Sequence, residues 1–184
     1  MDNNNLVNFS LKGFTSILIG AYIFIAGYVI NTILNGFLID DNPMGMLSVE
    51  IIEILIISII LFVFIFSSLA LFFKGKRKVK KDNYKLWNTE TKNSFRTYIL
   101  GIVIIIISLF VLNSLGLIDY LTPISLILYG ILLFILKNKE RKNILILSCL
   151  TIFLAIICIL IPSYWYSSLS ILGIAHIAYG VAVK

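Results

Sequence analysis

The chain has 184 residues, of which 60% are hydrophobic and only 13% are charged, whereas an average soluble domain carries about 25% charged residues. A water-soluble fold would expose apolar patches far larger than soluble monomers tolerate. The net charge of +6 comes from Lys and Arg that flank the apolar segments, which argues against a nucleic-acid-binding protein. The composition therefore predicts an integral membrane protein.

Six apolar segments follow one another along the chain, and they approach or exceed the roughly 20 residues that a helix needs to cross a bilayer. They cover residues 14–38, 49–73, 97–114, 119–136, 143–161 and 165–183. Continuous apolar runs such as 102–107 lack the alternation of a transmembrane β-strand. Because backbone polar groups in lipid must be paired, we expect a single all-α, polytopic domain of six transmembrane helices in three hairpins.

Only forty residues separate Arg96 from Lys137. The third and fourth spans are therefore expected to be short and upright, with a tight turn at Leu115 and Gly116 between them.

The fifteen Lys and Arg can all be placed on one side of the membrane. They lie at Lys12, in two predicted loops over 74–96 and 137–142, and at Lys184, whereas the connections 39–48, 113–119 and 162–164 contain none. Short Lys/Arg-rich loops stay cytoplasmic during insertion. We therefore expect both chain termini inside, and basic residues from Lys74 to Arg96 that attract anionic lipids of the inner leaflet.

The last two hairpins read as copies of one unit. A shift of fifty residues places Tyr129-Gly130 on Tyr179-Gly180 and the turn Asn113-Ser114 on Ser163-Tyr164. The first hairpin, with a longer outer loop, reads as a diverged third copy.

The repeated unit resembles the HdeD family of small acid-resistance membrane proteins. There a long apolar helix, a Pro-containing turn and a helix with an apolar-x-x-Gly-apolar ending recur three times. The matching residues are Ile152 to Pro162, Leu172-Gly173-Ile174 and Tyr179-Gly180-Val181, with Gly101 to Asn113 and Tyr129-Gly130-Ile131 in the preceding unit. The expected Pro of that preceding unit is Asn113, and the first unit lacks the terminal Gly. The resemblance implies a six-helix inner-membrane protein of a prokaryote without established catalytic residues.

His176 is the only histidine, and it lies eight residues before Lys184, roughly 12 Å along a helix from that end. Gly173 and Gly180 share its helix face. Small residues let helices approach closely in lipid, so we expect this face to pack against a neighbouring helix. His176 is then either a neutral side chain bonded across a helix pair, which we favour, or a proton-responsive or substrate-contacting group. Ser16, Gly20, Gly27, Ser67 and Ser68 are expected at other helix contacts.

Acidic residues gather at the outer side of the predicted spans. Glu50 and Glu53 begin the second span, and Asp119 begins the fourth, near Asp40 and Asp41. Such a rim could gather cations, with Glu53 the most desolvated member. Alternatively, acidic residues cross the membrane during insertion without penalty, and they stabilise helix N-termini through the helix dipole. We favour this second interpretation.

Catalytic and cofactor motifs are missing from the sequence. It contains no P-loop, no GxGxxG and no Cys/His metal pattern, so neither a metal nor a cofactor is expected. Cys149 and Cys158 are nine residues apart in one apolar segment, about 13 Å on a helix, which is too far for a mutual disulfide. Both are expected to be packing residues.

The sequence favours a non-enzymatic protein of a prokaryotic cytoplasmic membrane that serves envelope or acid-stress tolerance. The alternatives are a small transport subunit, similar in size to the substrate-binding component of vitamin transporters, and a proton-linked carrier. The sequence leaves open whether the chain forms homo-oligomers or binds partner proteins.

Overall fold

The protein was analysed as a computed structural model that describes residues 11, 13–37, 48–82, 89–136 and 144–183. The helices are α1 (Phe14–Phe37), α2 (Val49–Asp82), α3 (Thr89–Ser114), α4 (Leu121–Ile135), α5 (Ile144–Leu160) and α6 (Trp165–Ala182), with 3-10 turns η3 (Ile118–Tyr120) and η5 (Pro162–Tyr164). The described residues form no β-strand, and the predicted all-α class is confirmed.

The outer surface of the helices is apolar. Large side chains such as Leu160, Ile146 and Phe14 leave 75%, 72% and 68% of their surface uncovered. Four stretches are long and apolar enough to cross a membrane, namely Phe14–Gly36, Ile51–Arg77, Thr91–Ser114 and Ile118–Ile135. Because water would not tolerate this much exposed hydrocarbon, the structure indicates a membrane-embedded protein.

Two shorter helices complete the described set. α5 has 17 residues, and α6 has 18 but carries several polar side chains. Of these, Ser168 and His176 are buried against the other helices. α6 therefore keeps these two polar side chains away from the outer surface.

The prediction of a basic loop over residues 74–96 was wrong in its bounds. α2 continues through Lys74, Lys76 and Arg77 to Asp82, and α3 already begins at Thr89. Hydropathy shows where a chain becomes polar, not where its helix ends, and Lys and Arg are good helix formers. Tyr84 and Trp87 lie outside the described residues.

The expected short third span was also wrong, because α3 has 26 residues. α4 is short, with 15 residues, and it begins at Leu121. Asp119 therefore lies in the preceding turn η3 and not at the start of α4.

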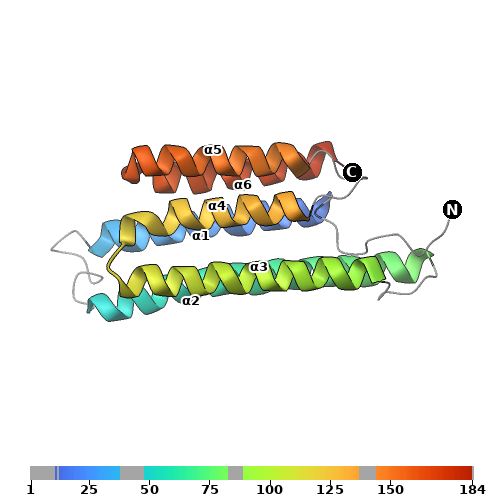
Figure 1. Ribbon diagram of the computed structural model, residues 1–184, viewed down its shortest axis with the longest axis horizontal. Helices are drawn as coiled ribbons and strands as arrows, with labels where there is room; N and C mark the ends of the chain where they lie inside the picture. The colour runs from blue at the N-terminus through green and yellow to red at the C-terminus, as the bar shows by residue number, and fades with distance from the viewer. Residues whose placement is uncertain (1–10, 12, 38–47, 83–88, 137–143, 184) are drawn as a thin grey trace.

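The six helices lie side by side along the long axis of the molecule (Figure 1). The most extensive packing joins α1 to α6 and α4 to α5. Both contacts are between hairpins, and both are more extensive than the packing of the two helices within any one hairpin. The neighbours therefore follow the order α2, α1, α6, α5, α4, α3. This arrangement is a ring that stays open between α2 and α3.

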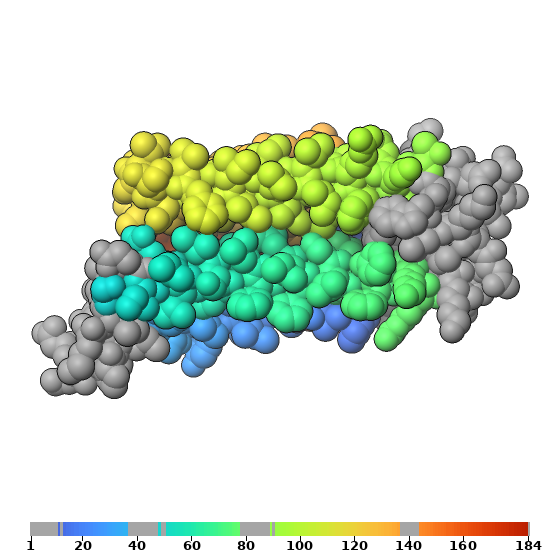
Figure 2. Space-filling model, turned by 90° about the horizontal axis from the view of Figure 1, so that it is seen from below, coloured from blue at the N-terminus to red at the C-terminus, as the bar shows by residue number. Residues whose placement is uncertain are grey.

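The opening between α2 and α3 is visible on the surface. In Figure 2 the two helices run as parallel bands, and red-brown atoms of the C-terminal part of the chain show in the depth between them. We call this groove the α2/α3 seam.

The two ends of the described chain meet at one end of the bundle. The backbone N–H of Gly13, just before α1, donates a hydrogen bond of 2.9 Å to the carbonyl of Val183, just after α6. Lys74 contacts this end as well, since its Nζ lies 4.0 Å from where a Cβ on Gly13 would stand. We call this the basic end, and the end with η3 and η5 the turn end (Figure 1).

The predicted turn at Leu115 and Gly116 is present at the turn end. Gly116 has a φ of +71°, its N–H bonds to the carbonyl of Asn113, and the N–H of Leu117 bonds to that of Leu112. This pair of bonds is a Schellman motif, in which glycine adopts the left-handed conformation without strain. The motif ends α3 and reverses the chain into α4.

Candidate functional site

His176 lies in the interior of the bundle with none of its surface exposed. α6 presents it between Ser16 of α1 and Tyr129 of α4. The hydroxyl of Tyr129 is 2.9 Å from Nε2, and the Ser16 hydroxyl is 3.3 Å from Nδ1 and 2.8 Å from the carbonyl oxygen of His176 itself. The three side chains form one polar cluster that joins three helices, and we call it the His176 cluster.

The hydrogen bonds of the His176 cluster fit one protonation pattern. Ser16 has a single hydroxyl proton, and it donates this proton to the His176 carbonyl. At Nδ1 the serine oxygen is therefore the acceptor, and Nδ1 carries the ring proton. Because a charged imidazolium would be costly at this fully buried position, we assign Nε2 as unprotonated, so that it accepts the proton of Tyr129. The imidazole is neutral with both nitrogens bonded, which leaves no lone pair for a metal or a substrate.

Glycines bring α1 and α6 close enough for this cluster. A Cβ on Gly20 would collide with the carbonyl oxygen of Gly173 and lie 2.9 Å from the Cβ of His176. A Cβ on Gly173 would lie 2.9 Å from the carbonyl oxygen of Gly20, and one on Gly180 would lie 2.6 Å from that of Gly13. The expected helix contacts at Gly20, Gly173 and Gly180 are thus backbone-to-backbone approaches. Gly27 differs, since a Cβ there would be 3.5 Å from Leu169, an ordinary contact.

Glu53 and Asp119 lie away from the His176 cluster. Glu53 is part-buried near the turn end of α2, where its Oε2 accepts a 3.2 Å hydrogen bond from the side-chain amide of Asn113 on α3. Asp119 is exposed in η3. The side chain of Glu50 and the residues Asp40 and Asp41 lie outside the described part of the chain.

The structure therefore does not join Glu53 and His176 into one polar path. The described residues also contain no group of His, Cys, Asp and Glu that could hold a metal ion.

Two further polar contacts were missed from the sequence. The phenol of Tyr98 on α3 lies 3.1 Å from the hydroxyl of Ser68 on α2, across the α2/α3 seam. The thiol of Cys158 on α5 lies 3.1 Å from the hydroxyl of Ser168 on α6. In the sequence, Tyr98 stands out as a tyrosine at the start of an apolar segment. A tyrosine near the end of a span usually lies at the membrane interface, so this position did not predict a contact between helices.

The predicted fifty-residue repeat pairs Tyr98 with a residue of the tighter α4–α5 contact. The fifty-residue shift aligns Tyr98 of α3 with Ser148 of α5. Ser148 is small, and it donates a 2.7 Å hydrogen bond to the carbonyl of Gly130 on the closely packed α4. Tyr98 carries a much larger side chain at the aligned position, and its hydroxyl lies 3.1 Å from that of Ser68 on α2.

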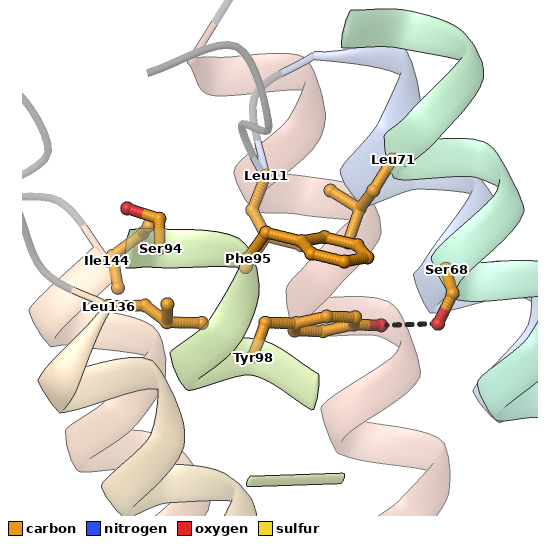
Figure 3. Close-up of a pocket in the computed structure, with 8 residues that line it drawn as sticks. All are labelled: Leu11, Ser68, Leu71, Ser94, Phe95, Tyr98, Leu136 and Ile144. Atoms are coloured by element: carbon orange, nitrogen blue, oxygen red, sulfur yellow. Dashed lines mark hydrogen bonds between the residues drawn. The ribbon is translucent and has the colours of Figure 1, made fainter. Parts of the chain in front are cut away.

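A crevice lies at the basic end of the seam (Figure 3). Its volume is about 30 Å³, which is room for little more than one water molecule. Helices α2, α3 and α5 contribute to its lining, as do Leu11, which precedes α1, and Leu136, which follows α4. The lining comprises Leu11, Ser68, Leu71, Ser94, Phe95, Tyr98, Leu136 and Ile144. Phe95 and Tyr98 point into it from α3, facing Leu71 and Ser68 on α2.

A second groove of about 200 Å³ lies between α1 and α2. It is lined by Tyr22, Ile25, Ala26, Val29, Ile59, Phe62, Val63 and Phe66. Tyr22 carries the one hydroxyl among these side chains, so the groove is suited to hydrocarbon.

Comparison with protein-family models, with characterised proteins and with solved structures finds no match to this chain. The fold and the His176 cluster are therefore the basis for assigning a function.

Proposed function

We propose that this protein crosses a prokaryotic cytoplasmic membrane six times, with its basic end in the cytosol, and acts there without enzymatic chemistry. The observation that carries this proposal is the hydrogen bond between Gly13 and Val183, which puts both ends of the described chain at the basic end. An even number of spans follows from that closure. The positive-inside bias then favours the cytosol for this end.

The two shorter helices are compatible with six spans. α5 and α6 are roughly 26 and 27 Å long at 1.5 Å per residue, close to the hydrocarbon thickness of about 30 Å. The buried Ser168 and His176 also support α6 as a span, since these side chains face other helices and not lipid.

Site-directed labelling tests the orientation. In a variant without the two native cysteines, Lys76→Cys introduces a thiol at the basic end and Ser163→Cys one at the turn end, and both positions are exposed. A membrane-impermeant maleimide applied to intact cells is expected to label Ser163→Cys, and to label Lys76→Cys only after permeabilisation. The reverse pattern would contradict the proposed orientation.

The role supported best is a structural one in envelope or acid-stress tolerance, as the resemblance to the HdeD family implies. The neutral, fully bonded His176 suits a packing role. A vitamin-binding transport subunit needs a larger site, because small-molecule pockets usually measure about 300–1,000 Å³. The crevice and the α1/α2 groove are both smaller. A proton-linked carrier needs a shared polar path, and Glu53 and His176 have separate hydrogen-bond partners.

Deleting the gene tests the stress role. We expect the deletion strain to survive exposure to low pH less well than its parent, measured as colony-forming units, and the intact gene on a plasmid to restore survival. Equal survival of the deletion strain and its parent would contradict this role without bearing on the six-span architecture.

A further inference from the structure

Helices α2 and α3 extend beyond the other helices at the basic end (Figure 1). Leu71 of α2 lines the crevice together with Ile144, the first residue of α5. The amine of Lys74 lies 4.0 Å from where a Cβ on Gly13 would stand, just before α1. Because Gly13 is bonded to the residue after α6, helices α1, α5 and α6 all end at this level. α2 continues for eight more residues to Asp82, about 12 Å.

We call residues 75–93 the basic arm. It consists of the end of α2, the beginning of α3 and residues 83–88 between them. Seven of its residues are Lys or Arg and two are acidic, so the arm carries +5 of the chain's net charge of +6. Lys76 and Arg77 on α2 and Lys92 on α3 are exposed. Nearly all of the excess positive charge is thus concentrated beyond the bundle.

Like charges repel one another along the α2 part of the arm. Lys76 and Lys80 are four residues apart in the helix, as are Arg77 and Lys81. Side chains with this spacing are neighbours on a helix surface, and like charges there destabilise the helix. A negatively charged partner would remove this repulsion and stabilise the end of α2. The basic arm is therefore complementary to an anionic molecule.

The described carboxylates of this chain do not supply the negative charge. Glu53 and Asp119 are the acidic residues whose side chains the structure describes. Both lie near the turn end, at the opposite end of the bundle from the arm. They are too far away to neutralise it.

The outer turn of the arm lies beyond the lipid headgroups. Lys74 follows the apolar run of α2, so the hydrocarbon layer ends near it. The headgroup layer adds about 5–8 Å on each side of the membrane. Lys80 and Lys81 are about 9–11 Å further along α2 than Lys74. A helix that lies on the membrane surface needs an apolar face, whereas Val79 is the one large apolar residue from 75 to 82.

We propose that the basic arm binds an acidic segment of a cytosolic protein. Six of its seven cations are Lys, which attracts carboxylates as a point charge, whereas Arg has the paired donors that recognise phosphate. This composition favours carboxylates over the phosphates of lipids and nucleic acids. The inference rests on the orientation proposed above, which places the arm in the cytosol and which cysteine labelling tests separately.

Binding of a fluorescent oligoglutamate peptide tests the surface. The purified full-length protein is placed in phosphatidylcholine nanodiscs, and peptide binding is followed by fluorescence anisotropy. We expect saturable binding that weakens as the salt concentration rises, and no binding of an oligoglutamine peptide of the same length. Tighter binding of an oligothymidylate of equal charge would assign the arm to nucleic acid and overturn the proposal.

Two pairs of substitutions locate the binding surface. Lys80→Gln with Lys81→Gln removes two charges from the outer turn, and Lys76→Gln with Arg77→Gln removes two from the turn within the headgroup layer. Both pairs change the net charge equally and lie in the same helix. We expect the outer pair to weaken peptide binding about tenfold, the combined effect of two exposed ion pairs. The inner pair should weaken binding less.

Absence of peptide binding would overturn the proposal. An effect of the inner pair that equals or exceeds that of the outer pair would also overturn it, and would assign the cations to lipid headgroups. Nanodiscs expose both ends of the protein, so a wrong orientation cannot produce either result. A wrong orientation would appear in the labelling of intact cells, with peptide binding unchanged.

Discussion

Gly20→Ala is expected to destabilise the protein by about 2–3 kcal/mol, the usual cost of adding a methyl group to a fully packed contact. The new Cβ would collide with the carbonyl oxygen of Gly173 and press on the Cβ of His176. A backbone carbonyl cannot rotate away as a flexible side chain can. Helices α1 and α6 must therefore separate, which also lengthens the bonds between Ser16 and His176 one turn away.

Gly27→Ala is the matched control for this change. Gly27 lies two turns further along α1, and a Cβ there meets Leu169 at 3.5 Å, an ordinary contact. Alanine also has a helix propensity about 1 kcal/mol better than glycine, so this variant should be neutral or slightly more stable. Reversible unfolding in mixed detergent–SDS micelles measures both free energies. If the two variants unfold alike, the close α1–α6 approach is not what stabilises the bundle.

His176→Ala is expected to destabilise the protein by about 3 kcal/mol or more. The substitution opens a cavity between three helices, and it leaves the buried hydroxyls of Ser16 and Tyr129 without their imidazole partner. Ile174→Ala, two residues earlier on α6, removes a side chain that is 55% exposed at the outer surface. Lipid can fill that space, so the control should cost far less.

A double-mutant cycle separates the hydrogen bond from the cavity. Tyr129→Phe alone should cost about 0.6–1.7 kcal/mol, the range of hydrogen bonds between helices in a membrane. In the His176→Ala background the same change should cost nearly nothing, because the phenol has already lost its acceptor. A full and equal cost of Tyr129→Phe in both backgrounds would show that Tyr129 does not act through His176.

The sequence predicted the helical class and the main helix positions. α1, α5 and α6 begin and end within one residue of the apolar segments 14–38, 143–161 and 165–183. The turn at Gly116 was also predicted, since glycine there interrupts a long apolar run. Each of these features depends on residues that are near one another along the chain, so local hydropathy and turn chemistry are sufficient.

The extent of α2 and α3 was not predicted, because a change from apolar to basic residues does not mark the end of a helix. A helix continues wherever its residues permit the backbone hydrogen bonds, and the stretch from Lys74 to Asp82 does so. At Lys74 the residues of α2 change from apolar to basic, and the helix continues to Asp82.

The partners of His176 were decided by the tertiary structure alone. The sequence marked His176 and its neighbouring glycines for a helix contact, yet Ser16 lies 160 residues away and Tyr129 lies 47 residues away. The contact between Tyr98 and Ser68 across the α2/α3 seam was equally hidden, because the two residues lie 30 positions apart in the sequence. Hydropathy is a property of each segment by itself and fixes which segments enter lipid. Which helices touch, and which stay apart, depends on the shapes of two distant surfaces, and only the folded chain brings those surfaces together.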